Sequence, residues 1–387
     1  MKNDIQKEAL AIHKKLRGKI EITPKAKLTK KNLGLFYTPG VGAVSTHIAN
    51  HPETANTMTL RGNTVAVVSD GSAVLGLGNI GPLGALPVME GKAMLFKALA
   101  GVDAFPIVLN TQDPDAIVEI VKALEPSFGA INLEDIAAPQ CFEIERRLRE
   151  SLKIPVMHDD QHGTAMVVLA GMINALKVRG SKKEDVRVVV NGAGAAGTAI
   201  TQLLLLYGFK HIVMVDSQGA IYTGRKEITN EKKHLATITN VSCNIDTNSA
   251  LCVKGDLKTA LQGADIFIGV SKGGILKQNM VRGMNPNPII FALANPVPEI
   301  YPDEAKKAGA LVVATGRSDF PNQINNALGF PGIFRGALDH NVTEITDEML
   351  MKASEKLAGI IKKPTSTLII PSPFDKAVVK AVSSAIK

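Results

Sequence analysis

Four acidic side chains in the middle of the chain have the positions expected of a metal site. They stand directly after the carboxyl ends of two short apolar runs: Glu134, Asp135, Asp159 and Asp160. The runs, 130–133 and 154–157, are joined by a charged segment with helical character at 139–152, as in two parallel strands with a crossover helix. Parallel strands end at the same edge of a sheet, so the four carboxylates are expected to converge. Because like charges need a counter-charge there, the arrangement favours Mg²⁺ or Mn²⁺; the alternative is two solvated strand ends.

A glycine-rich loop later in the chain has the spacing of a dinucleotide-binding site. The apolar run 186–191 predicts a strand, and a helical pattern and a second strand, 211–215, follow it. Between the first strand and the helix lies a six-residue loop: Gly192, Ala193, Gly194, Ala195, Ala196 and Gly197. The first glycine permits a tight turn, the second lets a pyrophosphate approach, and the third packs the helix on the strand. The pattern predicts binding of NAD or NADP.

The choice between NAD and NADP depends on side chains near the end of the second of these strands. Asp216 follows that strand and is expected to accept hydrogen bonds from the ribose 2′-hydroxyl of NAD and to repel a 2′-phosphate. Arg225 and Lys226 are close in sequence and could pair with a phosphate instead. This interpretation favours NAD and leaves NADP open.

Two side chains with acid–base chemistry lie nearer the N-terminus. A G-x-G-x-x-G pattern at 76–81 is interpreted as a close backbone approach and not as dinucleotide binding, because it continues into Pro82 instead of opening a helix. Lys92 then lies near the start of a helix predicted at 87–100, where a solvated surface position is the alternative. Tyr37 precedes a Pro-Gly step that places it on a loop or strand end.

Three asparagines stand where strands or helices of the second half begin or end: Asn295, Asn325 and Asn326. Asn295 follows the predicted strand 288–293, at the edge where a nicotinamide would lie. The other two stand at the start of a helix as neutral hydrogen-bonding groups. For each of them a turn or cap residue is the alternative.

The composition is that of an ordinary globular protein. The 387 residues are 45% hydrophobic and 21% charged, which suffices for two or three domains. The net charge of +8 comes from scattered lysines, which favours small anionic substrates over nucleic acid. No apolar run reaches the roughly 18 residues that a membrane span needs. The three cysteines lack metal-type spacing and predict free thiols in a reducing, cytoplasmic compartment: Cys141, Cys243 and Cys252.

The alternation of strand and helix patterns predicts an α/β protein with two domains. An N-terminal α/β catalytic domain is expected at 1–161, and a C-terminal Rossmann-type domain with a doubly wound parallel sheet at 162–387. The long apolar helix predicted at 162–178 lies at the boundary.

Eight stretches together resemble the malic enzyme family in its short bacterial form, in the family's order and over nearly the whole chain. They are L-F-Y-T-P-G-V at 35–41, D-G-S-A-V-L-G-L-G-N-I-G-P at 70–82, E-G-K at 90–92, N-L-E-D-I at 132–136, H-D-D-Q-H-G-T-A at 158–165, the G-A-G-A-A-G loop, A-L-A-N-P at 292–296 and N-N-A-L-G-F-P-G at 325–332. The resemblance implies oxidation of malate with NAD⁺ or NADP⁺, and its decarboxylation to pyruvate and CO₂ with Mg²⁺ or Mn²⁺.

The resemblance also implies a role for each candidate residue. Three carboxylates match the metal ligands: Glu134, Asp135 and Asp160. Lys92 matches the general base, Tyr37 the general acid, and Asp159 the group that orients the lysine. Lys92 and the three asparagines Asn295, Asn325 and Asn326 match positions that hold substrate or nicotinamide.

Two features complete the expectations drawn from the family. A small-molecule substrate and a homodimer are implied, with the loop of Tyr37 able to come from the partner subunit. The chain departs from the family at Ala73, where larger members carry an arginine that clamps a malate carboxylate. Another group must therefore hold that carboxylate.

Two other functions remain compatible with these residues. One is metal-assisted oxidative decarboxylation of a different 2-hydroxy acid by the same chemistry. The other is a non-catalytic dinucleotide-binding regulator, against which the presence of Lys92, Tyr37 and the acidic cluster argues.

Overall fold

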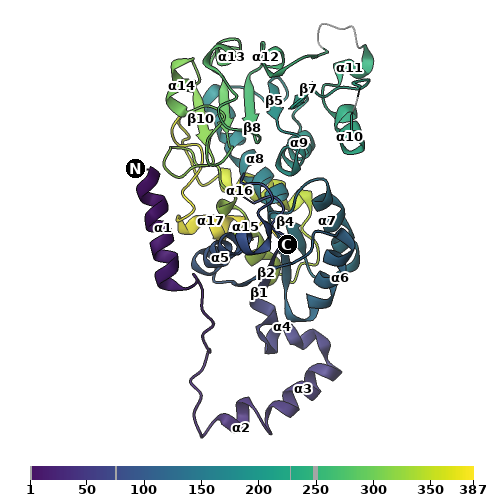
Figure 1. Cartoon of the computed structure of the whole chain (residues 1–387), viewed down its shortest axis with the longest axis vertical. Coiled ribbons are helices and arrows are strands. Elements are labelled where there is room, and N and C mark those ends of the chain that lie inside the picture. The colour runs from purple at the N-terminus through teal and green to yellow at the C-terminus, as the bar shows by residue number, and fades with distance from the viewer. Residues whose placement is uncertain (1, 75, 227, 247–251) are drawn as a thin grey trace.

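A computed structural model describes the chain except for residues 1, 75, 227 and 247–251 (Figure 1). The described strands form one sheet of four strands and one of six. In spatial order the first sheet consists of β2 (Asp103–Val108), β1 (Thr64–Ser69), β3 (Ala130–Leu133) and β4 (Val156–His158). The second consists of β10 (Val312–Thr315), β9 (Ile289–Ala292), β8 (Ile266–Gly269), β5 (Arg187–Asn191), β6 (His211–Asp216) and β7 (Gly219–Ala220). The predicted α/β class is confirmed.

Helices cover both faces of the first sheet. Its central strand, β1, is a buried T-V-A-V-V-S run, as expected for a parallel strand with helices on both sides. Val65 and Val67 belong to the core formed with α5 (Gly81–Ala100). Ala66 and Val68 face the opposite way, into a core with two helices: α6 (Pro114–Leu124) and α7 (Gln140–Ser151). β3 and β4 are parallel neighbours, so their carboxyl ends meet at one edge.

The second sheet is parallel except for β7, which pairs antiparallel with β6. The strand order reverses between β5 and β8, and ligands of open α/β sheets bind at such a point. Two long helices pack together on one face: α8 (Asp159–Arg179) and α9 (Ala195–Tyr207). Shorter helices complete this half: α10 (Asn230–Ile238), α11 (Ser242–Ile245), α12 (Leu257–Ala260), α13 (Gln278–Arg282) and α14 (Pro302–Lys307).

The C-terminal helices return to the first sheet (Figure 1). They are α15 (Phe330–Asp339), α16 (Asp347–Ala358) and α17 (Lys376–Ser383), preceded by the 3₁₀ turn η4 (Asn326–Leu328). The ring of Phe96 on α5 packs edge-on against Phe330 and Phe334 of α15, at centroid distances of 4.7 and 5.4 Å. One hydrophobic core thus spans both sheets, and the boundary near residue 162 stays a prediction.

The N-terminal segment forms an arm that extends away from the two sheets (Figure 1). The arm contains α2 (Leu33–Phe36), α3 (Val41–Asn50) and α4 (Ala55–Met58), with the 3₁₀ turns η1 (Pro52–Thr54) and η2 (Leu60–Asn63). Helix α1 (Lys2–Leu16) precedes the arm and runs along the side of the molecule in this view. A further 3₁₀ turn, η3 (Glu125–Ser127), follows α6. No residue of α2, α3 or α4 is buried. Among the described helices, none combines the length and apolarity needed to cross a bilayer.

The expectation that the first glycine pattern opens no helix is wrong. α5 begins at Gly81, directly after that pattern. Pro82 lies in the first turn, where a helix needs no N–H donor, and Pro87 lies inside the helix instead of at its start. Lys92 is therefore in the interior of α5, on the stripe of buried residues that contains Met89 and Phe96. The alternative of a solvated surface lysine is also wrong.

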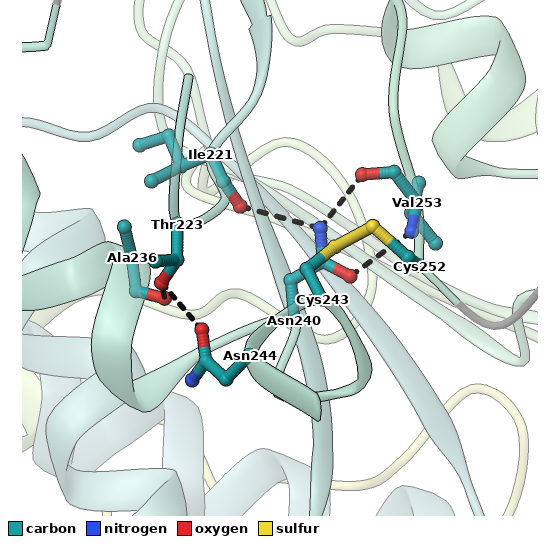
Figure 2. The surroundings of a disulfide bond; sticks show 8 residues. All are labelled: Ile221, Thr223, Ala236, Asn240, Cys243, Asn244, Cys252 and Val253. Atoms are coloured by element: carbon teal, nitrogen blue, oxygen red, sulfur yellow. Dashed lines mark hydrogen bonds between the residues drawn. A yellow bond between two sulfur atoms is a disulfide. The ribbon is translucent and has the colours of Figure 1, made fainter. Parts of the chain in front are cut away.

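The expectation of three free thiols is wrong as well. Cys243 and Cys252 form a disulfide, while Cys141 is a buried free thiol. Asn240, at a left-handed φ of 50°, precedes Cys243, and its side chain bonds to Val253, the residue after Cys252. Its amide nitrogen donates to the carbonyl of Val253, and its side-chain oxygen accepts from the Val253 N–H (Figure 2). The count and spacing of cysteines do not reveal such contacts between the two segments.

Candidate active site

Three carboxylates gather at the carboxyl edge of the first sheet. Glu134 and Asp135 directly follow β3, and Asp160 lies in the first turn of α8, directly after β4. Ligand atoms of the three side chains lie within 4.8 Å of one another. The structure thus brings together the acidic side chains that the sequence places at the ends of two neighbouring strands.

Backbone and side-chain donors hold this acidic cluster in place. The N–H of Asp135 donates to Oδ2 of Asp160 at 2.9 Å, while Asp135 itself has a left-handed φ of 53°. Such a backbone conformation is unfavourable for a residue with a Cβ and indicates a local constraint. The amide of Asn132 donates to Oε2 of Glu134 at 3.0 Å. Ala73 contributes through its backbone, because its N–H donates to the carbonyl of Asp135 at 2.9 Å.

The donor set of the cluster fits a hard divalent cation. Burial raises the pKa of Glu134, and although Lys92 lowers it, the adjacent aspartates raise it further, so that it lies well above its ordinary value. Neighbouring like charges disfavour one another, and a bound cation would offset this repulsion. Carboxylate oxygens are the ligands that Mg²⁺ and Mn²⁺ prefer, so the residues present suit the predicted metal.

Lys92 extends from α5 into the same volume. Its ammonium lies 2.5 Å from Oε1 of Glu134, also contacts Oδ2 of Asp159, and sits 4.4 Å from the ring centroid of Phe330. Only 6% of its side chain is exposed. Burial lowers the pKa of Lys92, but the carboxylates of Asp159, Glu134 and Asp160 outweigh burial and hold it above its ordinary value. Lys92 and the acidic cluster therefore form one electrostatic unit.

Asp159 is completely buried, and the position of its carboxylate requires a glycine one turn later. A Cβ at Gly163 would lie 1.8 Å from Oδ1 of Asp159, so a side chain there would displace the carboxylate. The absence of a Cβ lets Asp159 fold back over its own helix toward Lys92. The glycine of H-D-D-Q-H-G thus shapes the site although it carries no functional group.

The dinucleotide loop has the geometry expected of its three glycines. Gly192 has a φ of 123°, and a Cβ there would meet the carbonyl oxygen of Val270 at 2.7 Å. Gly194 caps α9 and has open space where a Cβ would stand. A Cβ at Gly197 would lie 1.8 Å from the carbonyl oxygen of Gly192, which enforces close packing of helix on strand. Helix α9 begins directly within this loop, and the first N–H groups of a helix, which lack partners inside the helix, are the donors that bind phosphate.

Asp216 at the end of β6 is held by two cations. Arg225 donates to both carboxylate oxygens, at 2.9 and 2.7 Å, and Lys232 donates to Oδ2 at 2.7 Å. Burial raises the pKa of Asp216, but Arg225 and Lys232 hold it far below its ordinary range. Lys226, which the sequence offered as a possible phosphate ligand, is exposed. The sequence reasoning missed Lys232, because a helix brings it back to the strand end.

Two of the three asparagines contact glycines of other sequence motifs, and the third is a helix cap. The backbone carbonyl oxygen of Asn295 would lie 2.5 Å from a Cβ at Gly76, and the φ of Gly76 is 73°. This is the close backbone approach that the first glycine pattern predicted. Asn326 lies beside Gly163 on α8. Asn325 accepts the Ala327 N–H at 2.9 Å, which is the helix-cap role named as its alternative.

Within one chain, Tyr37 does not lie with Lys92 and the acidic cluster. It follows α2 on the arm that extends away from the sheets, and 65% of it is exposed (Figure 1).

Glu299 is a buried acid at the carboxyl ends of β8 and β9 that the sequence reasoning missed. Its carboxylate accepts the N–H of Ser271 at 3.1 Å and that of Ala294 at 3.0 Å, which joins the loops after β8 and β9. Burial raises the pKa of Glu299. No local spacing signals this role, because both partners come from other strand ends.

Comparison with known proteins agrees with this architecture. Residues 17–149 match the malic enzyme N-terminal domain, and residues 161–386 match the malic enzyme NAD binding domain. The bifunctional malic/malolactic enzyme of Bacillus subtilis is 54% identical over 99% of this chain and 92% of its own length. The NAD-dependent malic enzyme of Geobacillus stearothermophilus is 53% identical over 95% of this chain and 76% of its own. The crystal structure of NAD-dependent malic enzyme from Thermotoga maritima is 52% identical, with a TM-score of 0.93 and 98% of both chains covered.

The fold and the site together define an oxidoreductase, with a dinucleotide-binding loop in one half of the chain and an acidic cluster suited to a cation in the other. The chain belongs to the malic enzyme family. The resemblance drawn from the sequence motifs is thereby confirmed.

Proposed function

We propose that the protein oxidises and decarboxylates malate to pyruvate and CO₂, with reduction of NAD⁺ or NADP⁺ and with a divalent cation. The observation that carries this proposal is the buried Lys92 ammonium in contact with Glu134 and Asp159. The contact of Asn295 with Gly76 supports it, because it sets the cofactor domain against the domain that bears the acidic cluster. Free NAD(P)⁺ is available inside the cell, and a cytoplasmic location forms part of the proposal.

Lys92 is the general base in this proposal. Its Nζ removes the proton of the substrate hydroxyl, and Asp159 holds the side chain in position through their direct contact. Glu134, Asp135 and Asp160 hold the cation. A bound Mg²⁺ or Mn²⁺ would act as a Lewis acid on substrate oxygens and offset the negative charge that otherwise favours protonated Lys92.

The assay for this function follows malate-dependent NADH formation. Purified protein with Mn²⁺ and NAD⁺ should form pyruvate and NADH in equal amounts. Faster turnover of another 2-hydroxy acid would overturn the assignment of malate. Dinucleotide binding without turnover of any such acid would indicate a regulator instead.

NAD is the proposed preferred cofactor. A 2′-phosphate would meet the carboxylate of Asp216, and the cations that could bind it, Arg225 and Lys232, are already paired with that carboxylate.

Replacing Asp216 with asparagine should shift the preference toward NADP. The change releases Arg225 and Lys232 from a charged partner, and hydrogen bonds to charged groups contribute roughly 1.5–3 kcal/mol, so the ratio of kcat/KM for NAD to that for NADP should fall about tenfold or more. Steady-state kinetics with both cofactors measures the ratio. Asp256→Asn, which alters the cap of α12 in the same domain, is the control. A wild-type preference for NADP would contradict the assignment.

Tyr37 is the proposed general acid, supplied by the partner subunit of a homodimer. Its arm exposes a series of apolar side chains: Leu28, Leu33, Leu35, Phe36 and Val44. An exposed apolar series on an extended arm is typical of a surface that packs on another chain. A symmetric dimer would exchange two arms, so that each site receives one tyrosine.

Tyr37→Phe should slow exchange of the C3 hydrogens of pyruvate with deuterated water by about 10²–10⁴-fold, the usual contribution of a general acid. Proton NMR of pyruvate with enzyme and Mn²⁺ measures the exchange, with Tyr207→Phe on α9 as the control. Mixing Tyr37→Phe with Lys92→Ala subunits should restore up to about a quarter of wild-type activity if the site is shared. Wild-type exchange in Tyr37→Phe would remove this residue from the role.

A further inference from the structure

One buried acid in the second half of the chain has no part in the chemistry described so far. Glu299 lies between β9 and α14, and it is completely buried. It takes part in none of the ion pairs between described residues, and backbone N–H groups hold its carboxylate instead. Removing a charge from water without an opposite charge nearby is costly, and natural proteins accept such costs mainly at functional sites.

The carboxylate of Glu299 joins the loops that follow two neighbouring strands. One oxygen accepts the N–H of Ser271 after β8 at 3.1 Å, and the other accepts the N–H of Ala294 after β9 at 3.0 Å. The backbone carbonyl of Glu299 also accepts the N–H of Leu276, at 3.0 Å. Since β8 and β9 are parallel neighbours, the two loops lie at the same edge of the second sheet.

The same contacts extend to the dinucleotide loop. The side-chain amide of Asn191 donates to the hydroxyl of Ser271 at 2.5 Å, and the N–H of Val270 donates to the carbonyl of Asn191 at 3.0 Å. Asn191 is the last residue of β5 and directly precedes Gly192. Glu299 thus connects the ends of β9, β8 and β5, and the strand order reverses between the last two.

The place of the Glu299 carboxyl group requires a glycine, and it is coupled to the place of Asn295. A Cβ at Gly269, the last residue of β8, would collide with the carboxyl carbon of Glu299. Asn295 directly follows Ala294, whose N–H donates to Glu299, and its backbone carbonyl approaches Gly76. Glu299 therefore holds the segment that presents Asn295, the residue expected where a nicotinamide would lie.

We propose that Glu299 is a positioning residue for the nicotinamide half of the cofactor. By joining the loops after β8 and β9, it fixes Ser271 and Asn295 where they border the nicotinamide. The inference rests on the dinucleotide binding of the proposed function and adds to it the residue that orders the reactive end of the cofactor. A purely structural role would change folding stability, or would change the affinity for all dinucleotide fragments equally.

Glu299→Gln tests this role with almost no change in shape. The glutamine amide has one oxygen, so it can accept one of the two N–H groups, while its own NH₂ group faces the other donor. The Kd for NADH should therefore rise about tenfold, as expected when a hydrogen bond to a charged group is lost. The Kd for ADP-ribose, which lacks the nicotinamide, should stay at its wild-type value. Isothermal titration calorimetry measures both constants.

Glu304→Gln is the matched control, because Glu304 is an exposed acid in the first turn of the following helix, α14. It should bind NADH and ADP-ribose with wild-type affinity. Equal losses for the two ligands in folded Glu299→Gln would show a structural role and overturn the inference, and so would wild-type affinity for both. A wild-type protein that binds NADH without oxidising malate would overturn the proposed function, while the binding comparison would still decide the role of Glu299.

Gly269→Ala decides the matter if Glu299→Gln does not fold. The added methyl group would displace the carboxyl group of Glu299, which is the end of a flexible side chain, and would keep the charge. This variant should also bind NADH about tenfold more weakly and ADP-ribose with wild-type affinity. Wild-type affinity for NADH in Gly269→Ala would contradict the assignment.

Discussion

Replacing Lys92 with alanine is expected to lower the rate of malate oxidation by about 10²–10⁴-fold, the usual contribution of a general base. The variant lacks the group that takes the hydroxyl proton, yet it keeps all three carboxylates of the acidic cluster. Removal of a positive charge 2.5 Å from Glu134 should leave Mn²⁺ binding as tight as in the wild type or tighter. Steady-state kinetics and Mn²⁺ titration measure the two effects separately.

Lys97→Ala on the same helix is the control, since the side chain of Lys97 is 63% exposed and pairs with Asp103. It should oxidise malate at the wild-type rate. Lys92→Arg adds a second comparison, because arginine keeps the positive charge and cannot be deprotonated in proteins. Wild-type turnover in Lys92→Arg would show that charge alone matters and would rule out Lys92 as the base.

The parts of the site that follow strand ends could be predicted from local sequence. Glu134 and Asp160 converge because a parallel crossover forces neighbouring strands to end at one edge. Gly192 and Gly197 show in the structure the contacts that their spacing implies, since each lacks the Cβ that would collide with backbone. Such features depend on a few residues in sequence and on one topological rule.

The contacts that complete the site could not be predicted in this way. Phe330 reaches Lys92 from a C-terminal helix that packs back on the first sheet. Lys232 reaches Asp216 from α10, while the nearer Lys226 is exposed. These contacts depend on how helices pack, and periodicity carries no information about that packing.

Other misses have distinct physical causes. α5 begins at Gly81 because a proline in the first turn is compatible with a helix, although Pro82 looked like a break. Cys243 and Cys252 pair in a segment whose two ends are joined by hydrogen bonds between Asn240 and Val253, contacts that spacing rules do not reveal. Tyr37 lies on the exposed arm, away from the acidic cluster, so its role as general acid stays a prediction.

Asp160→Asn is expected to reduce Mn²⁺ affinity by more than the roughly 10–100-fold that loss of a ligand-orienting residue costs. The amide oxygen can still accept the N–H of Asp135, which donates to Oδ2 at 2.9 Å in the wild type, so the local fold should persist. The substitution removes one of the three negative charges of the acidic cluster, and the affinity of a cation site depends on the charge of its ligands. Malate oxidation should therefore fall at low Mn²⁺ and recover in part as Mn²⁺ is raised.

Chelation separates this loss of affinity from a loss of structure. EDTA should abolish malate oxidation by the wild-type protein, and added Mn²⁺ should restore it. The reason is that the side chains that bind the cation, Asp135 among them, should keep their folded positions beside Lys92 when the cation is removed. Asp115→Asn, whose side chain is 80% exposed on α6, is the matched control and should keep the wild-type dependence on Mn²⁺. Full activity in metal-free buffer would contradict a catalytic cation. In that case the ammonium of Lys92, 2.5 Å from Glu134, would be the positive charge that offsets the repulsion among Glu134, Asp135 and Asp160.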